Sequence, residues 1–526
     1  MNGETIQILC AMIGYMLIVI LIGVFFAKRS QANSENYFLG GRSLGPWVAA
    51  MSAEASDMSG WLLMGLPGVA YWCGIADAAW TAIGLAVGTY INWLCVSKRL
   101  RAYSAVSGDS ITVPDFLSNR FHEKKKVILG ISATFILIFF TVYAASCFVT
   151  CGKLFSGLFG YDYHIMMIVG AIFVIIYTFL GGFLAESASD FMQAVVMIVA
   201  LVSVVGIGTA NAGGFGAVIE NAKAIPGYFT LTGMAQPLVD AETGVQLIEN
   251  GKPLFDDALP YGLLTILSTA SWGLGYFGMP QVLLRFMAIR KSSELKRSRR
   301  IATVWVVISL FSAVFIGVLG RYLLGTDPSL ITKSGAENVF ANLSKMLFHA
   351  FPIVAGIIMA GILAATISSS DSYLLIAASA VSKNLFEGII KKDATDKQVM
   401  RVSRVVLLLI SLIGIGIAWN ENSVIFEIVS FAWSGFGATF GPIMLFSLFW
   451  KRTNRAGAIA GMVSGGAMVF IWKLLLKPLG GIFGIYELMP AFLVSCVFIV
   501  VVSLITAKPS AEIEAEFDKA KNYVEA

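Results

Sequence analysis

The sequence predicts an all-α polytopic membrane protein with about 13 transmembrane helices, and three observations lead to this fold class. Of the 526 residues, 57% are hydrophobic and only 13% are charged, whereas about a quarter are charged in a typical soluble domain. The apolar residues come in blocks of about twenty, which is the length that a helix needs to cross a bilayer. Because lipid leaves an open sheet edge unsatisfied, helices are the structures expected to span it.

Thirteen apolar blocks account for most of the chain. We interpret the first block as a retained helix and not a secretion signal, because its leader contains Glu4 and no basic residue. The connection 211–258 contains several acidic residues and is interpreted as a solvated loop, and residues 509–526 as a short amphipathic helix in the cytoplasm. The blocks cover residues 6–27, 44–71, 75–96, 127–155, 165–184, 191–210, 259–289, 301–324, 351–380, 402–419, 424–450, 456–476 and 488–505.

Basic residues predict the orientation of these blocks, since lysine and arginine gather in cytoplasmic loops. With the amino terminus outside and the carboxyl terminus in the cytoplasm, all but eight of the 37 Lys and Arg residues lie inside, in segments such as 98–126 and 285–300. The eight exceptions are Lys153, Lys223, Lys252, Arg321, Lys333, Lys345, Lys473 and Lys477. This bias requires an odd number of crossings. It also explains the net charge of +5 without a nucleic-acid partner, and we expect a bacterial cell (inner) membrane location.

The sequence contains no residue grouping typical of an enzyme. The six cysteines lie within or at the ends of apolar blocks, and the three histidines lie toward block ends or loops. No His, Cys and carboxylate spacing resembles a metal centre, and no nucleophile–base pair is evident. We therefore predict a protein without enzymatic activity, without an organic cofactor and without an obligatory protein partner.

Two blocks contain residues that interrupt a helix. The second contains Gly60, Gly65, Pro67 and Gly68, and the seventh has three glycines and a proline within 271–280. Such residues loosen a helix, and the released carbonyls can bind ions when they line a cavity. The two blocks are five apart, so each would open one half of a five-plus-five inverted repeat, which is a pointer to a transporter's substrate site. Close packing at small residues is the alternative explanation for either block alone.

Polar residues in two blocks suggest where an ion could bind. Asp57, in the second block, costs several kcal/mol near mid-membrane unless it is paired, hydrated or used, so we predict a cation site or pathway nearby. Capping of a half-helix is the alternative. In the ninth block, positions 365, 368, 369 and 372 share one helix face that presents serine hydroxyls. Sodium takes oxygen ligands, although serine-rich faces also serve as plain packing surfaces. Glu54 and Asp371 receive no role.

Several strings of the sequence resemble the sodium/solute symporter family from the first helix to the tail. The strings are residues 38–46, 55–68, 272–278 with Pro280, 362–365, 440–442 and 456–462. Those at 56–61 and 272–278 are typical of the proline-transporting branch. The resemblance implies a leucine-transporter-like core of ten helices. It divides the chain into 1–43, a core at 44–450 with halves 44–210 and 259–450, two further helices at 451–508, and the tail 509–526.

The resemblance also implies roles for individual residues. Co-transported Na⁺ would be held by backbone oxygens of Ala55, Met58 and Ala365 and by the hydroxyls of Ser368 and Ser369. Ion coupling would involve Asp57, Arg42 and Asp190. The small-molecule substrate, L-proline, would lie near Ser59, Tyr143, Trp272, Tyr276 and Pro280. Ser369 stands where the family often has threonine, and oxygen coordination survives that change.

Sodium-coupled proline uptake by alternating access is therefore the predicted function. The nearest alternative is a sodium symporter for another small solute, such as pantothenate, a sugar or a monocarboxylate. A membrane sensor with a transporter-like fold is disfavoured because nothing in the sequence resembles an appended signalling domain. An ion channel is disfavoured because no repeated filter-like segment is present.

Overall fold

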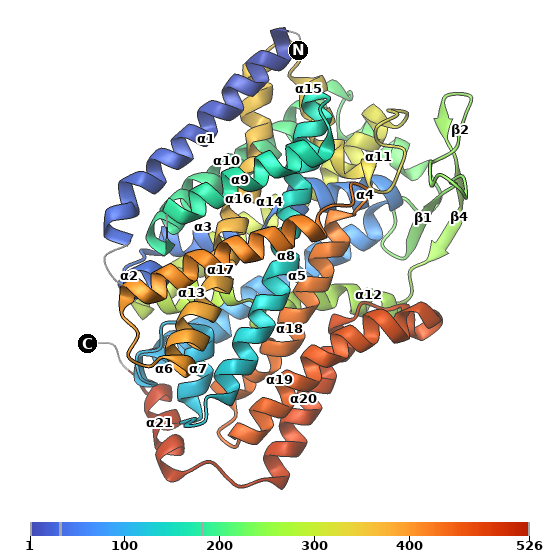
Figure 1. The fold of residues 1–526 in the computed structure, drawn as a ribbon. Coiled ribbons are helices and arrows are strands. Elements are labelled where there is room, and N and C mark those ends of the chain that lie inside the picture. Colours follow the sequence, from blue (N-terminus) through green and yellow to red (C-terminus); the bar gives the residue numbers. More distant parts are fainter. Residues whose placement is uncertain (1–2, 31–33, 181, 524–526) are drawn as a thin grey trace.

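The computed structural model describes residues 3–30, 34–180 and 182–523, most of which lie in helices (Figure 1). Within these residues, ten helices are long and apolar enough to cross a membrane. Three shorter apolar helices, Trp61–Cys73, Tyr163–Phe179 and Leu263–Phe277, coincide with the second, fifth and seventh predicted blocks. The predicted fold class, a polytopic helical membrane protein, is confirmed.

The first part of the chain, up to residue 223, is helical apart from short connections. A π-helical turn, Asn92–Val96, joins two of the helices into one long rod. The helices are α1 (Gly3–Ser30), α2 (Ser34–Leu39), α3 (Pro46–Asp57), α4 (Leu66–Cys73), α5 (Ile75–Ile91), α6 (Ser97–Val106), α7 (Val113–Arg120), α8 (Val127–Phe159), α9 (Tyr163–Leu180), α10 (Phe183–Asn211) and α11 (Phe215–Lys223).

The second part of the chain, from residue 263, is helical in the same way. A π-helical stretch, Ala380–Ile390, prolongs one helix beyond its regular end. The helices are α12 (Leu263–Ala270), α13 (Pro280–Ala288), α14 (Leu295–Leu324), α15 (Val339–Leu347), α16 (Pro352–Ser379), α17 (Asp396–Ile417), α18 (Ile425–Phe449), α19 (Arg455–Ile471), α20 (Leu488–Ile505) and α21 (Ala511–Lys521).

The long connection 211–258 is more ordered than the predicted solvated loop. It contains α11 and two antiparallel pairs, β1 (Gly233–Pro237) with β4 (Phe255–Pro260) and β2 (Ile248–Glu249) with β3 (Lys252–Pro253). Arg321 of α14 anchors this layer, since its guanidinium lies 4.7 Å from the centre of the Phe255 ring and donates a 2.8 Å hydrogen bond to Gln246. Strands of two to six residues were too short for the sequence pattern to reveal.

The predicted boundary between the fifth and sixth blocks is wrong. The prediction left residues 185–190 outside any helix, whereas α10 begins at Phe183. Gly182 has a φ of 81°, which favours glycine and separates α10 from α9. Glu186 and Asp190 lowered the local hydropathy, but both carboxyl groups are buried in the first turns of α10. The two charged residues interrupt the apolar pattern in the sequence, although they belong to a buried polar cluster.

Helices α16 and α18 form the centre of the molecule, and most of each is buried. Helix α16 packs against α1, α8 and α10, and α18 packs against α8, α19 and α20. Helices α1 and α17 lie at the periphery, where apolar residues such as Leu21 and Leu412 are exposed. In a polytopic protein this exposed apolar surface is the one that faces lipid.

The helical bundle has two ends, which Figure 1 shows at opposite sides of the molecule. One end carries the strands, α11 and α15, and the other carries α6, α7 and the tail helix α21. Helix α21 is present where the sequence predicts an amphipathic helix. It packs through Phe517, whose ring centre lies 4.8 Å from the Arg99 guanidinium, and Asp518 accepts a 2.7 Å bond from Lys451. The first helix, from Gly3, and the last helix, α21, therefore begin and end the described chain at opposite ends of the bundle.

Candidate functional site

The second predicted helix is interrupted at its middle, as the sequence predicts. Helix α3 ends at Asp57, Met58 and Ser59 are not helical, and the chain returns to helix through a π-helical turn, Trp61–Gly65, that leads into α4. Helix α8 approaches the break closely, because a Cβ on Gly60 would lie 2.3 Å from Thr150 Oγ1. Gly60 therefore permits the contact between the interrupted helix and α8.

The seventh predicted helix is interrupted at the corresponding place. Helix α12 ends at Ala270, a 3₁₀ turn covers Ser271–Phe277, and α13 starts at Pro280. Gly273 lies against α5 so closely that a Cβ would be 2.2 Å from the Gly84 carbonyl oxygen. Both interruptions are buried, so the released backbone groups face protein and not lipid.

Four of the five residues predicted to bind sodium are in direct contact. Ser368 Oγ donates to the Ala55 carbonyl at 2.8 Å and to the Ala365 carbonyl at 3.1 Å, and Ser369 Oγ donates to the Ala55 carbonyl at 3.2 Å. Met58 lies in the same break, with its sulfur 3.7 Å from the Ser309 hydroxyl. All five residues are fully buried. Oxygen atoms from α3 and α16 thus converge on one point, and such oxygens suit a hard cation.

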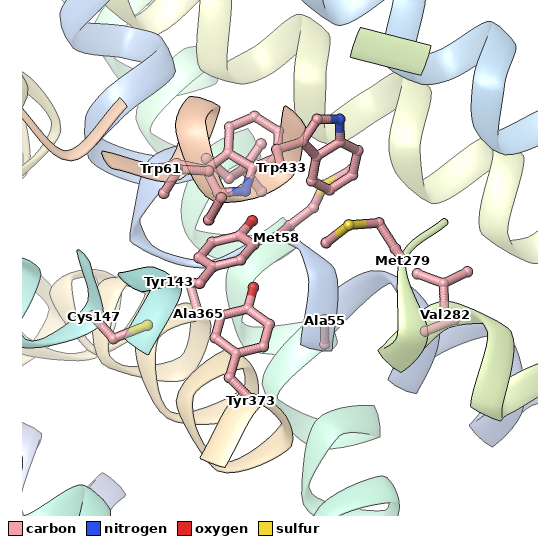
Figure 2. Packing of buried hydrophobic residues seen from close by; sticks show 14 of the residues in the cluster. Ala55, Met58, Trp61, Tyr143, Cys147, Met279, Val282, Ala365, Tyr373 and Trp433 are labelled. Carbon is pink, nitrogen blue, oxygen red and sulfur yellow. The ribbon is translucent and has the colours of Figure 1, made fainter. Parts of the chain in front are cut away.

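The Asp57 backbone oxygen lies beside the Ala55 group and collects three donors. Trp61 Nε1 donates to it at 3.2 Å, and the hydroxyls of Tyr143 and Tyr373 donate at 3.4 Å each. The two tyrosine rings stack with centres 4.2 Å apart, and Figure 2 shows them side by side below Trp61. Helices α8 and α16 therefore both contact the break in the second helix through these tyrosines.

The Asp57 carboxyl group is only partly satisfied. Gln281 Nε2 donates to Oδ1 at 3.2 Å, whereas Oδ2 has no hydrogen-bond partner among the described residues. The hydroxyl of Ser59, two residues away and fully buried, also lacks a partner there. Unsatisfied buried polar groups cost free energy. A polar or charged ligand in the break would supply the missing partners.

Aromatic rings cover one side of the interruptions. Trp272 lies among four rings, with centre-to-centre distances of 5.1–6.2 Å, and its carbonyl accepts a 2.8 Å bond from Trp433 Nε1. Tyr276 meets Trp433 edge to face at 5.1 Å. The four rings around Trp272 are those of Trp61, Phe426, Trp433 and Tyr486. An apolar part of a ligand would find its contacts here.

Pro280 and Arg42 lie toward the end that carries α6 and α7. Pro280 is the first residue of α13 and lines a small cavity with Thr112 and Ile376, whereas its neighbour Gln281 contacts Asp57. Arg42 donates to the Met287 and Ser110 carbonyls at 2.8 Å each. It thereby ties the end of α13 to the turn after α6 and closes this end of the molecule.

Asp190 belongs to a buried charge cluster that the sequence did not reveal. Its Oδ2 accepts bonds from Ser52 Oγ at 2.7 Å and from Arg285 Nη2 at 3.2 Å. Arg285 also pairs with Glu186, and both contact Ser372, one turn beyond Ser368 on α16. Arg285 is fully buried, so its assignment to the basic inner-loop segment 285–300 is wrong.

A second buried ion pair, Lys153–Glu337, closes the end of the molecule that lies opposite Arg42. Lys153 Nζ of α8 lies 2.6 Å from Glu337 Oε2, and the two side chains are 6% and 2% exposed. The Glu337 carboxylate also accepts the backbone N–H groups of Ile425 and Phe426, which start α18, at 3.0 and 3.1 Å. The interrupted helix is close as well, since a Cβ on Gly68 would lie 2.9 Å from Glu337 Cα. With both ends closed, the central residues are occluded from solvent.

The residues that sequence reasoning missed are the partners of those it found. Tyr373 could have been predicted from the sequence, because it lies four residues after Ser369 and continues the same helix face. Arg285 and Glu186 are charges at the edges of apolar blocks, and pairing them required knowing that α10 and α13 meet. Trp433 and Gln281 carried no signal of their own.

Comparison with known proteins assigns the family. The model of the sodium:solute symporter family matches residues 37–465. The chain belongs to this family. A sodium/proline symporter of Staphylococcus aureus (strain USA300 / TCH1516) is 40% identical over 517 residues, which cover 97% of this chain and 95% of the relative. The chain is thus a sodium-coupled membrane transporter and not an enzyme.

Solved structures support the fold independently. A Na⁺-coupled sialic acid symporter, solved in a substrate-bound outward-open state, is 20% identical with a TM-score of 0.74, over 96% of this chain and 99% of the other. A nucleobase-cation-symport-1 family transporter, solved in a closed conformation with bromovinylhydantoin bound, is 14% identical with a TM-score of 0.54, over 93% and 100% of the chains. The expected leucine-transporter-like architecture is confirmed.

Proposed function

We propose that this protein carries L-proline together with sodium across the bacterial cell (inner) membrane by alternating access. The observation that carries this proposal is the 40% identity, over 97% of the chain, to a sodium/proline symporter. The amino terminus would face outside and the carboxyl terminus the cytoplasm, with residues 44–450 as the transport core. Neither an organic cofactor nor an obligatory protein partner is part of the proposal.

The sodium site in this proposal joins the two halves of the core. The Ala55 carbonyl already accepts hydrogen bonds from the hydroxyls of Ser368 and Ser369, and the Ser368 hydroxyl also reaches the Ala365 carbonyl. A cation could bind between the same oxygens. Each serine hydroxyl would then turn its proton away from the carbonyl and present a lone pair to the cation. Met58 would add a backbone oxygen from the break. Asp57, Asp190 and Arg42 would govern coupling without being assigned as direct ligands.

Proline would bind between the two interruptions. It is a small zwitterion with a carboxylate, a secondary ammonium and an apolar ring. Asp57 Oδ2, Ser59 Oγ and the Tyr276 hydroxyl are among the buried polar atoms without a hydrogen-bond partner in the described residues, and the rings around Trp272 suit the apolar part. Tyr143, Tyr276 and Pro280 complete the proposed substrate residues. The amino-terminal end of the helical segment that follows the break carries a partial positive charge, which favours the carboxylate of proline.

The transport cycle follows from the two closed ends. Sodium binding would hold α3 against α16 and complete the proline pocket. The protein would open in turn at the Lys153–Glu337 end and at the Arg42 end. Between these two states, both ends would be closed around the bound sodium and proline. A tenfold sodium gradient supplies about 1.4 kcal/mol, and about 100 mV adds about 2.3 kcal/mol per charge. At one ion per solute, these terms sustain a proline ratio of several hundredfold.

Substrate competition tests this proposal. Purified protein in sodium-driven vesicles should take up radiolabelled proline, and sodium replacement by choline should stop the uptake. Unlabelled proline should compete, whereas pantothenate, a sugar and a monocarboxylate should not. Sodium-dependent uptake of one of those solutes without competition by proline would overturn the substrate assignment. Sodium flux without any solute would instead favour a channel.

A further inference from the structure

A cavity outside the transport site lies at the basic end of the molecule. Its volume is about 620 Å³, and it separates the α5–α6 rod from the start of α14. Its walls include Trp93 and Leu94 of the π-helical turn between α5 and α6, and residues on either side of the α14 amino terminus. No residue of the proposed sodium and proline site lines it.

Four cations face this cavity without a carboxylate partner among the described residues. They are Lys98, Lys291, Lys296 and Arg299, and no Asp or Glu oxygen in the described part of the chain forms an ion pair with any of them within 4.0 Å. Two other basic residues at this end do have a carboxylate partner, Arg290 with Glu294 and Lys383 with Glu387. Four like charges around one space repel each other, and an anion between them relieves that repulsion.

The start of α14 adds to this positive field. The helix runs from Leu295 to Leu324, and Ser292 and Ser293 in the turn before it also line the cavity. The first N–H groups of a helix carry a partial positive charge that favours anions, phosphate groups in particular. Lysines, an arginine, the Ser293 hydroxyl and a helix amino terminus are together the donor set of a phosphate site.

One side of the cavity is continuous with the lipid-facing surface. Leu94 lines it and is 44% exposed, and Ile91 and Tyr90, one turn earlier on the same rod, are exposed as well. A soluble anion would gain nothing from this apolar rim. A phospholipid would place its phosphate among the cations and its acyl chains along the rim, and basic pockets between helices on the cytoplasmic side are suited to anionic headgroups.

We propose that this cavity binds the phosphate headgroup of an anionic phospholipid from the inner leaflet. Lys98, Lys291, Lys296 and Arg299 neutralise the headgroup, and the lipid bridges α6 and α14 where these helices leave the membrane. The assignment to the inner leaflet depends on the orientation proposed above. The site does not depend on which solute the protein carries.

Lipid retention by paired variants tests this site. The variant Lys291→Gln/Lys296→Gln removes two cavity charges, and Lys124→Gln/Lys125→Gln removes two exposed charges from the loop between α7 and α8 at the same end. Native mass spectrometry on purified protein titrated with phosphatidylglycerol or phosphatidylcholine of matched chains measures bound lipid. Wild type and the loop variant should retain phosphatidylglycerol in preference to phosphatidylcholine. The cavity variant should bind it about thirtyfold more weakly, at roughly fivefold per charge.

Two results would overturn the proposal. Equal phosphatidylglycerol retention by the cavity and loop variants would place the lipid elsewhere. Displacement of the lipid by an equal concentration of inorganic phosphate would make the occupant a soluble anion. Unfolding temperatures of the lipid-free variants should match wild type, because the substituted lysines are exposed. The lipid-binding assay does not measure transport, so its result is independent of the proline assignment.

Discussion

At the scale of single residues, Asp57 belongs both to the helix break and to the proposed ligand site. Its backbone oxygen accepts bonds from two tyrosines and a tryptophan, while one oxygen of its carboxyl group has no hydrogen-bond partner in the part of the chain that the structure describes. The backbone contacts that shape the break do not use the carboxylate. The side chain is therefore available for ion coupling without being needed for the fold.

Replacing Asp57 should separate transport from folding. We expect Asp57→Ala to lower sodium-dependent proline uptake by more than about a hundredfold, equivalent to about 2.7 kcal/mol of lost stabilisation. Membrane insertion and yield should stay at wild-type levels. The matched control is Ser56→Ala, because Ser56 Oγ bonds only within its own helix, to the Ala53 carbonyl at 3.2 Å. Wild-type uptake by the Asp57 variant would remove this carboxylate from the mechanism.

Residue patterns revealed the polar groups of the site more readily than their partners. The i, i+3, i+4, i+7 spacing places Ser368 and Ser369 on one face, and the structure turns that face toward Ala55. The contact between Arg285 and Glu186 joins residues 99 positions apart. Periodicity within one helix carries no information about which other helix it meets, so such pairs could not be predicted.

At the scale of elements, the Lys153–Glu337 pair joins α8 and the start of α18 to the 3₁₀ turn Gly335–Asn338 that precedes α15. Breaking one partner leaves a buried charge uncompensated, which costs about 3–5 kcal/mol. We therefore expect Glu337→Ala to lower both the unfolding temperature and the uptake rate. The α18 start would also lose the acceptor of its Ile425 and Phe426 N–H groups.

A double-mutant cycle checks this interpretation of the pair. Lys153→Met should be destabilising alone, and Lys153→Met/Glu337→Ala should be less destabilising than the two single losses added, because the double variant buries no unpaired charge. Thermal unfolding of the four proteins gives the coupling free energy. Purely additive losses would show that the two side chains do not stabilise each other.

The cluster around Arg285 gives a second prediction for the elements. Arg285→Gln leaves Glu186 and Asp190 without their cation, so we expect a loss of about 3–5 kcal/mol in unfolding free energy, with loss of uptake. Arg285→Lys should be intermediate, since lysine keeps the charge without the planar fork of donors. The control Arg290→Gln removes an exposed guanidinium and should change neither. Stability of Arg285→Gln equal to wild type would contradict the buried pairing.

The sequence predicted where the helices occur more accurately than where each helix begins and ends. Both helix interruptions were predicted correctly from glycine and proline positions, because these residues act on the local backbone. The start of α10 was misplaced because Glu186 and Asp190 look solvent-exposed in sequence. Their burial depends on Arg285 from α13, which only the folded chain brings to them.

At the scale of the whole molecule, the charge pattern and the architecture agree. The uneven distribution of basic residues required an odd number of crossings, and the described chain starts and finishes at opposite ends of the bundle (Figure 1). Arg321 and Lys153, two of the eight exceptions to the basic bias, lie at the end that carries the long loop. The strands in that loop were not predictable, because they are short and outside the apolar pattern.

The central claim is that sodium couples the two halves of the core by joining the Ala55 carbonyl on α3 to Ser368 on α16. The most direct test is the initial rate of proline uptake against sodium concentration in vesicles containing wild type, Ser368→Ala or Ser370→Ala. Ser370 is the matched control, because its hydroxyl bonds to the Thr366 carbonyl of its own helix at 2.6 Å. Ser368→Ala should raise the half-saturating sodium concentration by about tenfold, for about 1.4 kcal/mol of lost ion binding, with little change in the proline KM at saturating sodium, and Ser370→Ala should match wild type. Superimposable sodium curves for wild type and Ser368→Ala would contradict the account.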